Sequence, residues 1–137
     1  VQTCALPICG FGSGRPDAQT LRFSVEGGRD YPCGVHDAVV DLDLAHGMSC
    51  AVRSDGSVWC WGWNLWGQLG DGTLVESHVP LPVQGLSSGV TTLAAGGATT
   101  CAILASGGMK CWGDNQHGQL GDGTTVNRSL PVEVSGF

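Results

Sequence analysis

The chain has 137 residues, including 23 Gly and 5 Trp, and its formal net charge is −6 with only 13% charged residues. Its 6 Lys and Arg residues are scattered, whereas nucleic-acid binding needs clustered basic residues, so we expect no DNA or RNA partner. No apolar run approaches the ~20 residues of a membrane span. The many glycines, and the lack of an apolar stripe of helical period, predict an all-β fold of short strands and tight turns.

The N-terminal part of the sequence shows no clear pattern. Residues 1–8 resemble the translation of a sequencing-library adapter, so we leave them out of the fold reasoning, as one would a cloning scar. Residues 9–33 are either a degenerate piece of a repeat or a flexible segment, because residues 10–14 have the composition of a linker. We expect the parent protein to continue upstream.

The first clear element is a β-hairpin over residues 50–60. Two short strands flank a turn whose last residue is Gly56, which suits a type I turn followed by a left-handed residue. In this register Cys50 faces Cys60 in a non-hydrogen-bonded position. There the two Cα atoms lie about 4.5 Å apart, within the range that a disulfide requires.

The same hairpin recurs around Cys101 and Cys111, so the sequence predicts two cross-strand disulfides. Each would stabilise the fold by about 2–3 kcal/mol. Buried thiols and a metal site are the alternatives, although the spacing of Cys50 and Cys60 lacks the close ligand pairs of structural zinc sites. Disulfides form in oxidising compartments, which favours an extracellular or cell-envelope location and leaves a cytoplasmic one open.

A glycine-rich segment follows each hairpin, and the two segments match. A shift of 51 residues, which carries Cys50 onto Cys101, aligns residues 41–86 with 92–137 without a gap. The motif residues of the first copy are Trp61, Gly62, Asn64, Gly67, Gln68, Leu69, Gly70, Asp71 and Gly72. Those of the second copy are Trp112, Gly113, Asn115, Gly118, Gln119, Leu120, Gly121, Asp122 and Gly123. The sequence therefore predicts two consecutive repeats, residues 34–84 and 85–137.

The repeated pattern resembles the regulator-of-chromosome-condensation repeat family, in the cysteine-containing version common in bacterial proteins. The resemblance implies that each repeat supplies one four-stranded blade of a seven-bladed β-propeller. Because two blades cannot close such a ring, we expect a fragment of a larger propeller.

The residues shared by both copies are predicted to be structural. The glycines suit positive φ angles or close strand approach. The shared aspartates suit hydrogen bonding to backbone amides within turns. Trp61 and Trp112 are expected to fill the space between blades.

The copies differ most beside the Trp-Gly motif, where the first has large apolar residues and the second polar ones. The positions are Trp63, Leu65 and Trp66 against Asp114, Gln116 and His117. Aromatic residues are enriched at the hot spots of interfaces, so we hypothesise that the three apolar residues form a protein-binding or glycan-binding face. The alternative is that they pack against a preceding blade.

No catalytic, cofactor-binding or metal-binding constellation stands out. Residues 85–89 match the G-x-S-x-G pattern of a nucleophile elbow, but no helix pattern follows them. Asp41 and Asp43 could share a face, yet the second copy has Thr92 and Ala94 there, so loop solvation is favoured over a metal site. We therefore expect no enzyme activity, no cofactor and no metal.

These observations predict a non-catalytic protein-interaction module, part of an exported bacterial protein. The family resemblance adds two alternatives: an exchange-factor-like regulator of a small GTPase, and the regulatory domain of a larger enzyme. The paired cysteines and the acidic balance argue against the nuclear exchange-factor alternative.

Overall fold

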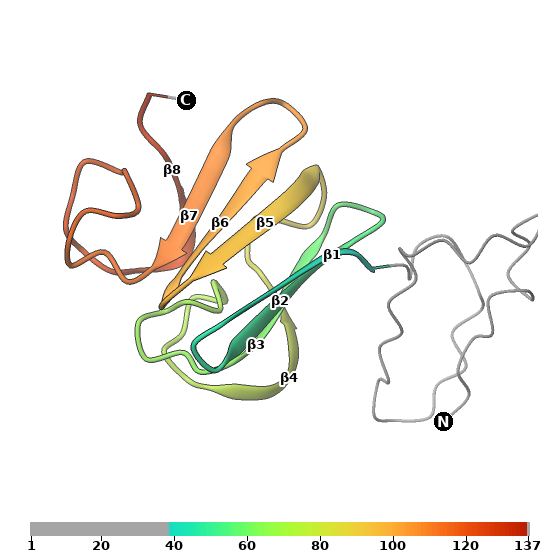
Figure 1. Ribbon diagram of the computed structural model, residues 1–137, viewed down its shortest axis with the longest axis horizontal. Coiled ribbons are helices and arrows are strands. Elements are labelled where there is room, and N and C mark those ends of the chain that lie inside the picture. The colour runs from blue at the N-terminus through green and yellow to red at the C-terminus, as the bar shows by residue number, and fades with distance from the viewer. Residues whose placement is uncertain (1–38, 137) are drawn as a thin grey trace, which may run out of the picture.

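The computed structural model describes residues 39–136, which form two four-stranded antiparallel sheets (Figure 1). Blade 1 consists of β1 (Val39–Ala45), β2 (Met48–Arg53), β3 (Val58–Gly62) and β4 (Ser77–Pro82), in that order across the sheet. Blade 2 consists of β5 (Val90–Gly96), β6 (Thr99–Leu104), β7 (Met109–Gly113) and β8 (Arg128–Glu133). The all-β prediction is confirmed, whereas the predictions for residues 1–8 and 9–33 lie outside the described residues. Within this part of the chain, no helix is long and apolar enough to cross a membrane.

The hairpin register predicted from the sequence is present in both blades. In blade 1, β2 and β3 place Val52 opposite Val58 and Cys50 opposite Cys60. Gly56 ends the turn with a φ of 79°, in the left-handed region that favours glycine. Local turn chemistry therefore sets which residues of each hairpin face the same side of its sheet.

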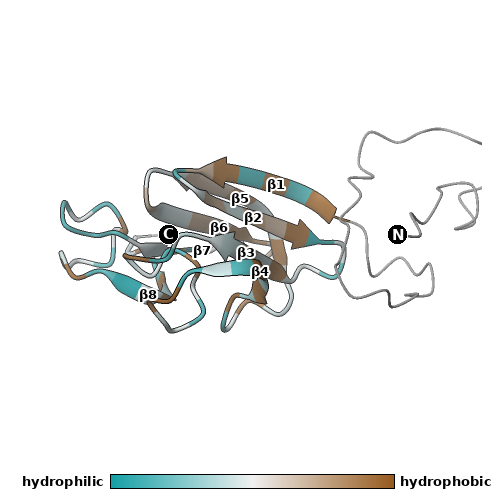
Figure 2. Cartoon of the chain, turned by 90° about the horizontal axis from the view of Figure 1, so that it is seen from below, coloured by the Kyte–Doolittle hydropathy of each residue, from teal (hydrophilic) through white to brown (hydrophobic). Residues whose placement is uncertain are grey.

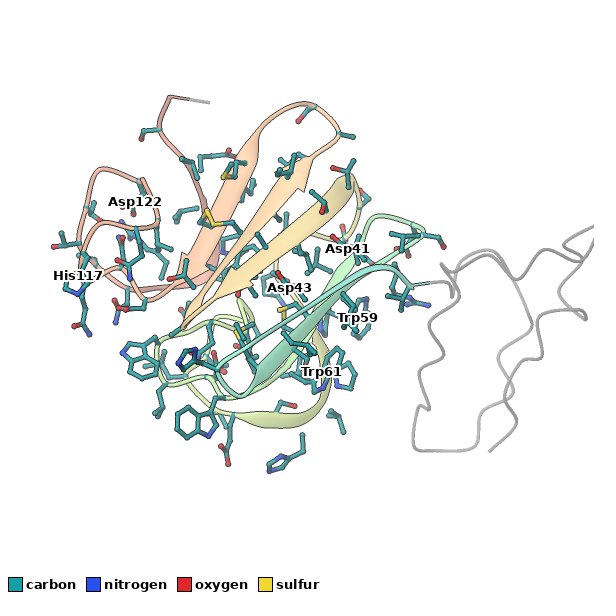
Figure 3. The ribbon with its side chains drawn as sticks, in the orientation of Figure 1. Asp41, Asp43, Trp59, Trp61, His117 and Asp122 are labelled. Atoms are coloured by element: carbon teal, nitrogen blue, oxygen red, sulfur yellow. A yellow bond between two sulfur atoms is a disulfide. The ribbon has the colours of Figure 1, made fainter. Side chains whose placement is uncertain are left out.

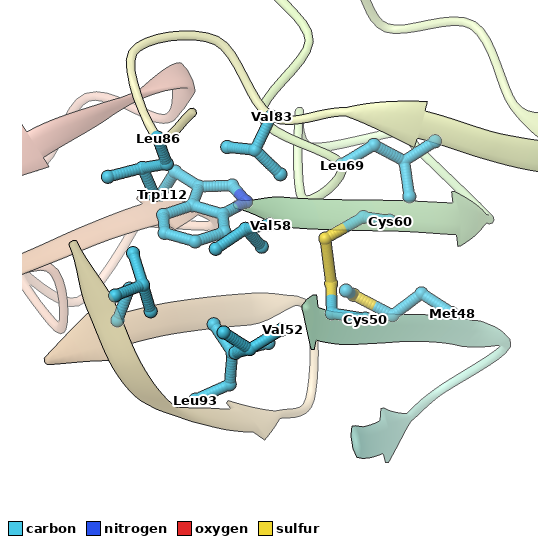
Figure 4. Close-up of a cluster of buried hydrophobic side chains, with 12 residues drawn as sticks. Met48, Cys50, Val52, Val58, Cys60, Leu69, Val83, Leu86, Leu93 and Trp112 are labelled. Atoms are coloured by element: carbon cyan, nitrogen blue, oxygen red, sulfur yellow. A yellow bond between two sulfur atoms is a disulfide. The ribbon is translucent and has the colours of Figure 1, made fainter. Parts of the chain in front are cut away.

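The hydrophobic core lies between the two blades, because a single sheet cannot bury a face against itself. Strands β1 and β2 contact β5, and the close-up in Figure 4 shows the side chains that fill the space. Val52 and Leu69 of blade 1 pack in one cluster with Leu93 and Trp112 of blade 2. Fully burying an aliphatic or aromatic side chain contributes about 1.5–3 kcal/mol, so this shared core holds the blades together.

Two aspartates of β1 also join the blades. The Asp41 carboxylate accepts hydrogen bonds from the Thr92 hydroxyl at 2.6 Å and from the Leu93 amide at 2.8 Å. The Asp43 carboxylate accepts one from the Ala95 amide at 2.6 Å. Loop solvation was the wrong interpretation for this pair, because both residues lie in a strand and bond the neighbouring strand β5 (Figure 3).

Hydropathy follows the same arrangement. Figure 2 shows hydrophilic residues along β8 and the loop before it, at the edge of blade 2 farthest from β5. The strands near the blade contact are more apolar in the same view. The β8 edge of blade 2 is thus exposed to solvent. The long loops between β3 and β4 and between β7 and β8 lie at the same end of the two sheets (Figure 1).

Candidate interaction surface

A buried asparagine holds each long loop in shape. The Asn64 side-chain amide donates to the Asp71 carboxylate at 3.2 Å and to the carbonyls of Thr73 and Val75, each at 3.0 Å. Its side-chain oxygen accepts from the Leu69 amide at 3.0 Å. Asn64 is 1% exposed, so these bonds satisfy the side chain entirely inside the loop.

Asn115 repeats this arrangement in blade 2. Its side-chain amide donates to Asp122 at 3.1 Å and to the carbonyls of Thr124 and Val126 at 3.1 and 3.0 Å. Its oxygen accepts from the Leu120 amide at 3.0 Å. Because the shared polar side chains are used within the loop, they form a scaffold and are not offered to a ligand.

Asp122 is the most perturbed ionisable group of the loops. Its carboxylate accepts from the Thr124 hydroxyl at 2.8 Å, from the Thr124 amide at 2.9 Å and from the Arg128 guanidinium at 2.8 Å. These bonds, the Thr124 hydroxyl first among them, hold the pKa of Asp122 well below its ordinary value of 3.8. The charge therefore stabilises the loop fold and has a structural role.

Trp112 lies between the blades, as the sequence predicted. It is 0% exposed, and its indole Nε1 donates to the Gln68 carbonyl of blade 1 at 2.8 Å. Gly70 makes room for the ring, because a Cβ there would lie 2.8 Å from that indole nitrogen. Trp61, the counterpart in blade 1, is half-buried and lies with Trp59 on the sheet face opposite Cys60 (Figure 3).

Both cysteine pairs lie at disulfide distance. The S–S separations are 2.05 Å for Cys50–Cys60 and 2.09 Å for Cys101–Cys111. The first pair is buried in the shared core, whereas Cys101 of the second pair is half-buried. Among the described residues, no group of three or more His, Cys, Asp or Glu is arranged to hold a metal ion.

The three apolar residues singled out in the sequence lie at the end of β3. Trp63 is 51% exposed and Leu65 is 61% exposed, while Trp66 is half-buried. The Trp63 amide donates to the Gly47 carbonyl at 3.0 Å, and the Trp63 side chain lies against Gly47, in the turn between β1 and β2. Trp63 therefore packs on its own blade and still presents about half of its surface to solvent.

Two residues of β1 and its turn extend this surface, and neither belongs to the repeat motif. Leu44 is 64% exposed at the end of β1, and His46 is exposed in the turn with a φ of 31°, which is unusual for a residue other than glycine. We call these five residues the loop-face patch: Leu44, His46, Trp63, Leu65 and Trp66. Their counterparts in blade 2 are Ala95, Gly97, Asp114, Gln116 and His117. A comparison of all exposed positions between the repeats, and not only of positions within the motif, finds Leu44 and His46.

In the part of the chain that the structure describes, the side-chain amide of Gln68 lacks a hydrogen-bond acceptor because Trp63 occupies the position that Asp114 has in blade 2. In blade 2 the Gln119 side-chain amide donates to the Asp114 carboxylate at 3.0 Å. In blade 1 Trp63 stands where Asp114 would, and the Gln68 amide nitrogen is buried with no partner among the described residues. An unsatisfied buried donor destabilises a fold by about 1–3 kcal/mol, so stability alone does not account for a tryptophan at this position.

A family model described as "Regulator of chromosome condensation (RCC1) repeat" matches residues 55–103 and 106–137, more than half of the chain. The chain belongs to the RCC1 repeat family. A second model with the same description matches residues 90–119. The first match begins in the turn between β2 and β3 and ends in β6, so one RCC1 sequence repeat contributes strands to two adjacent blades.

Two curated relatives show how this sequence is used in longer proteins. Human E3 ubiquitin-protein ligase HERC2 is 37% identical over 100 residues, which are 72% of this chain and 2% of HERC2. The Ultraviolet-B receptor UVR8 of Arabidopsis thaliana is 34% identical over 138 residues, covering 95% of this chain and 30% of UVR8. The chain thus spans less than a third of either relative.

A solved structure confirms the architecture. Yeast RCC1 (Prp20), in its complex with Kap60, superposes with a TM-score of 0.63 and 20% identity over 82% of this chain and 24% of that one. At this identity the likeness shows the fold, namely two blades of a β-propeller.

Proposed function

We propose that this chain is part of a non-catalytic protein-interaction module that binds its partner through the loop-face patch. The observation that carries the proposal is Trp63, an exposed aromatic residue that replaces the acceptor needed by a buried amide. A residue that weakens the fold and faces solvent is explained by contact with another molecule. The motif residues support the same division of labour, since their polar groups bond within the loops.

Two further observations support the proposal. Yeast RCC1, which shares the fold, is bound to the protein Kap60 in its solved structure. The two disulfides support an exported parent protein, because such bonds persist in oxidising compartments.

A loop exchange tests the proposal. Trp63→Asp, Leu65→Gln and Trp66→His together install the blade 2 residues, and the introduced carboxylate would supply an acceptor to Gln68. We expect this variant to keep its unfolding free energy within about 1 kcal/mol of the parent and to lose binding. The measurement is cross-linking to secreted proteins of the source organism, followed by titration of each purified cross-linked protein.

The matched control is Val126→Thr, which changes a residue 59% exposed on the equivalent loop of blade 2. This control should bind like the parent. Equal affinity of the loop-exchange variant and the parent for every cross-linked protein would contradict the proposal.

A second candidate function is the regulatory part of a larger enzyme. The observation that favours it is HERC2, a ubiquitin ligase of which a chain like this one forms 2%. A long sequencing read across the source locus distinguishes the two: a fused catalytic domain supports the second candidate, and an export signal followed only by repeats contradicts it.

A further inference from the structure

The triplet Asn127-Arg128-Ser129 fits the acceptor pattern for N-linked glycosylation, which is Asn, any residue except Pro, then Ser or Thr. Asn64 and Asn115 are not part of such a triplet. Asn127 is the last residue of the loop between β7 and β8, and β8 begins at Arg128. Because so short a triplet also arises by chance, the position of Asn127 in the fold decides whether it can carry a glycan.

The side chain of Asn127 is held at its oxygen and open at its nitrogen. Asn127 is exposed, and its Oδ1 accepts a hydrogen bond from the Asn115 backbone amide at 2.8 Å. Among the described residues, none forms a hydrogen bond with Asn127 Nδ2, the atom to which a sugar would be attached. The attachment leaves Oδ1 unchanged, so the bond that fixes the end of this loop is retained.

Asn127 lies at the outer rim of blade 2, away from the contact between the blades. Strand β8 is the edge of its sheet farthest from β5, and the blades meet through β1 and β2 on one side and β5 on the other. Hydrophilic residues line this edge and the loop before it (Figure 2). A glycan at the start of β8 therefore points into solvent and does not disturb the core.

A neighbouring blade leaves this position uncovered on either side. Glu76 is the equivalent of Asn127 in blade 1, and its side chain is 56% exposed although blade 2 packs against blade 1. Asn127 is itself exposed although blade 1 packs against blade 2. The site therefore stays open within a larger propeller, and its exposure does not depend on where this piece of the propeller begins or ends.

The outer edge of blade 2 is also less protected than that of blade 1. An edge strand presents unpaired backbone groups that can pair with another chain. Pro82 of β4 cannot donate such a hydrogen bond, whereas β8 has Glu133 at the equivalent position. Val126 and Leu130, on either side of Asn127, are 59% and 48% exposed. A hydrophilic glycan at Asn127 would cover this part of the edge.

We propose that Asn127 is an acceptor for N-linked glycosylation in the exported protein. Its Nδ2 atom attacks the anomeric carbon of an oligosaccharide that is joined to a lipid through a diphosphate. A C–N bond forms, the bond from that carbon to the diphosphate oxygen breaks, Nδ2 releases one proton and the lipid diphosphate leaves. The inference goes beyond the proposed function and takes from it only that the parent protein is exported.

Secretion of the full 137-residue chain from a eukaryotic cell line, behind a cleavable export signal, tests the proposal. Because the signal is supplied, the result does not depend on whether the parent protein is exported or on the loop-face patch. We expect the secreted chain to migrate more slowly in electrophoresis, and treatment with a peptide N-glycosidase to abolish the shift. This enzyme converts the modified asparagine into aspartate, so peptide mass spectrometry identifies its position.

Two variants remove the acceptor triplet in different ways. Asn127→Gln removes the acceptor residue, whereas Ser129→Ala keeps Asn127 and its bond to Asn115, so folding is preserved. Both should lose the shift completely. Glu76→Asn with His78→Ser installs the triplet at the equivalent position of blade 1, and this variant should carry a second glycan and keep the circular dichroism of the parent. A parent chain that is secreted without a glycan, or a Ser129→Ala variant that keeps one, would overturn the proposal.

Discussion

At the scale of single residues, the loops depend on a few polar side chains with fixed partners. Asn64 and Asn115 each replace several missing backbone contacts, which explains why a loop without regular structure keeps one shape. The aspartates bond backbone amides of the turn, as their residue type suggested. The role of the asparagines was not evident beforehand, because their acceptors lie up to 11 residues away along an irregular segment.

Acid should weaken the loop of blade 2 through Asp122. Its pKa in the folded chain is below 3.8, the value expected when unfolded, so its stabilising contribution is complete above about pH 4 and is lost as the pH falls further. We expect the unfolding free energy to drop as the pH falls below about 4, and to drop less in Asp122→Asn. Urea denaturation at several pH values measures this. Arg128→Gln should flatten the same profile partly, and an unchanged profile in Asp122→Asn would contradict the assignment.

At the scale of elements, the hairpins were the most predictable part of the fold. Turn position and strand alternation set the register of Cys50 against Cys60 from a few local residues. The bonds from Asp41 to β5 were not predictable in this way, because they join residues 51 and 52 positions apart in the chain. The unsatisfied side-chain amide of Gln68 was not predictable either, because it depends on which residue occupies position 63.

The two disulfides close loops of equal length but differ in how accessible they are to a reductant. Both have a sequence separation of 10, so each should contribute a similar ~2–3 kcal/mol through the unfolded chain. Cys50 and Cys60 are buried between the blades, whereas Cys101 is half-buried. We expect mild reductant to open Cys101–Cys111 first, as measured by alkylation and peptide mass spectrometry in the native state. Equal rates of alkylation would show that the blades separate readily.

At the scale of the whole molecule, the contact between the two blades stabilises the fold. The buried cluster draws side chains from both sheets, and the aspartates of β1 bond the backbone of β5. The two blades should therefore unfold together. The sequence predicted that Trp112 lies between the blades. It did not predict that the indole donates to the Gln68 carbonyl, because these two residues are 44 positions apart in the chain.

Trp112→Phe tests this cooperativity. The change keeps a ring in the core and removes the bond to the Gln68 carbonyl, so it should lower the unfolding free energy by about 1–3 kcal/mol. Calorimetry should show a single transition at a lower temperature, since both blades share the core. Trp59→Phe, on the other face of blade 1, is the control and should have a smaller effect. Two separate transitions in the variant would show that each blade is stable alone.

The offset between RCC1 sequence repeats and blades has an evolutionary consequence. A repeat such as residues 55–103 spans the outer half of one blade and the inner half of the next. A gene duplication of one such unit therefore inserts a unit that fits its neighbours, because each unit carries one tryptophan and one glutamine carbonyl that can repeat the bond between Trp112 and Gln68. Lineages can therefore gain or lose blades by unequal recombination without a new interface, while exposed positions such as the loop-face patch diverge between copies.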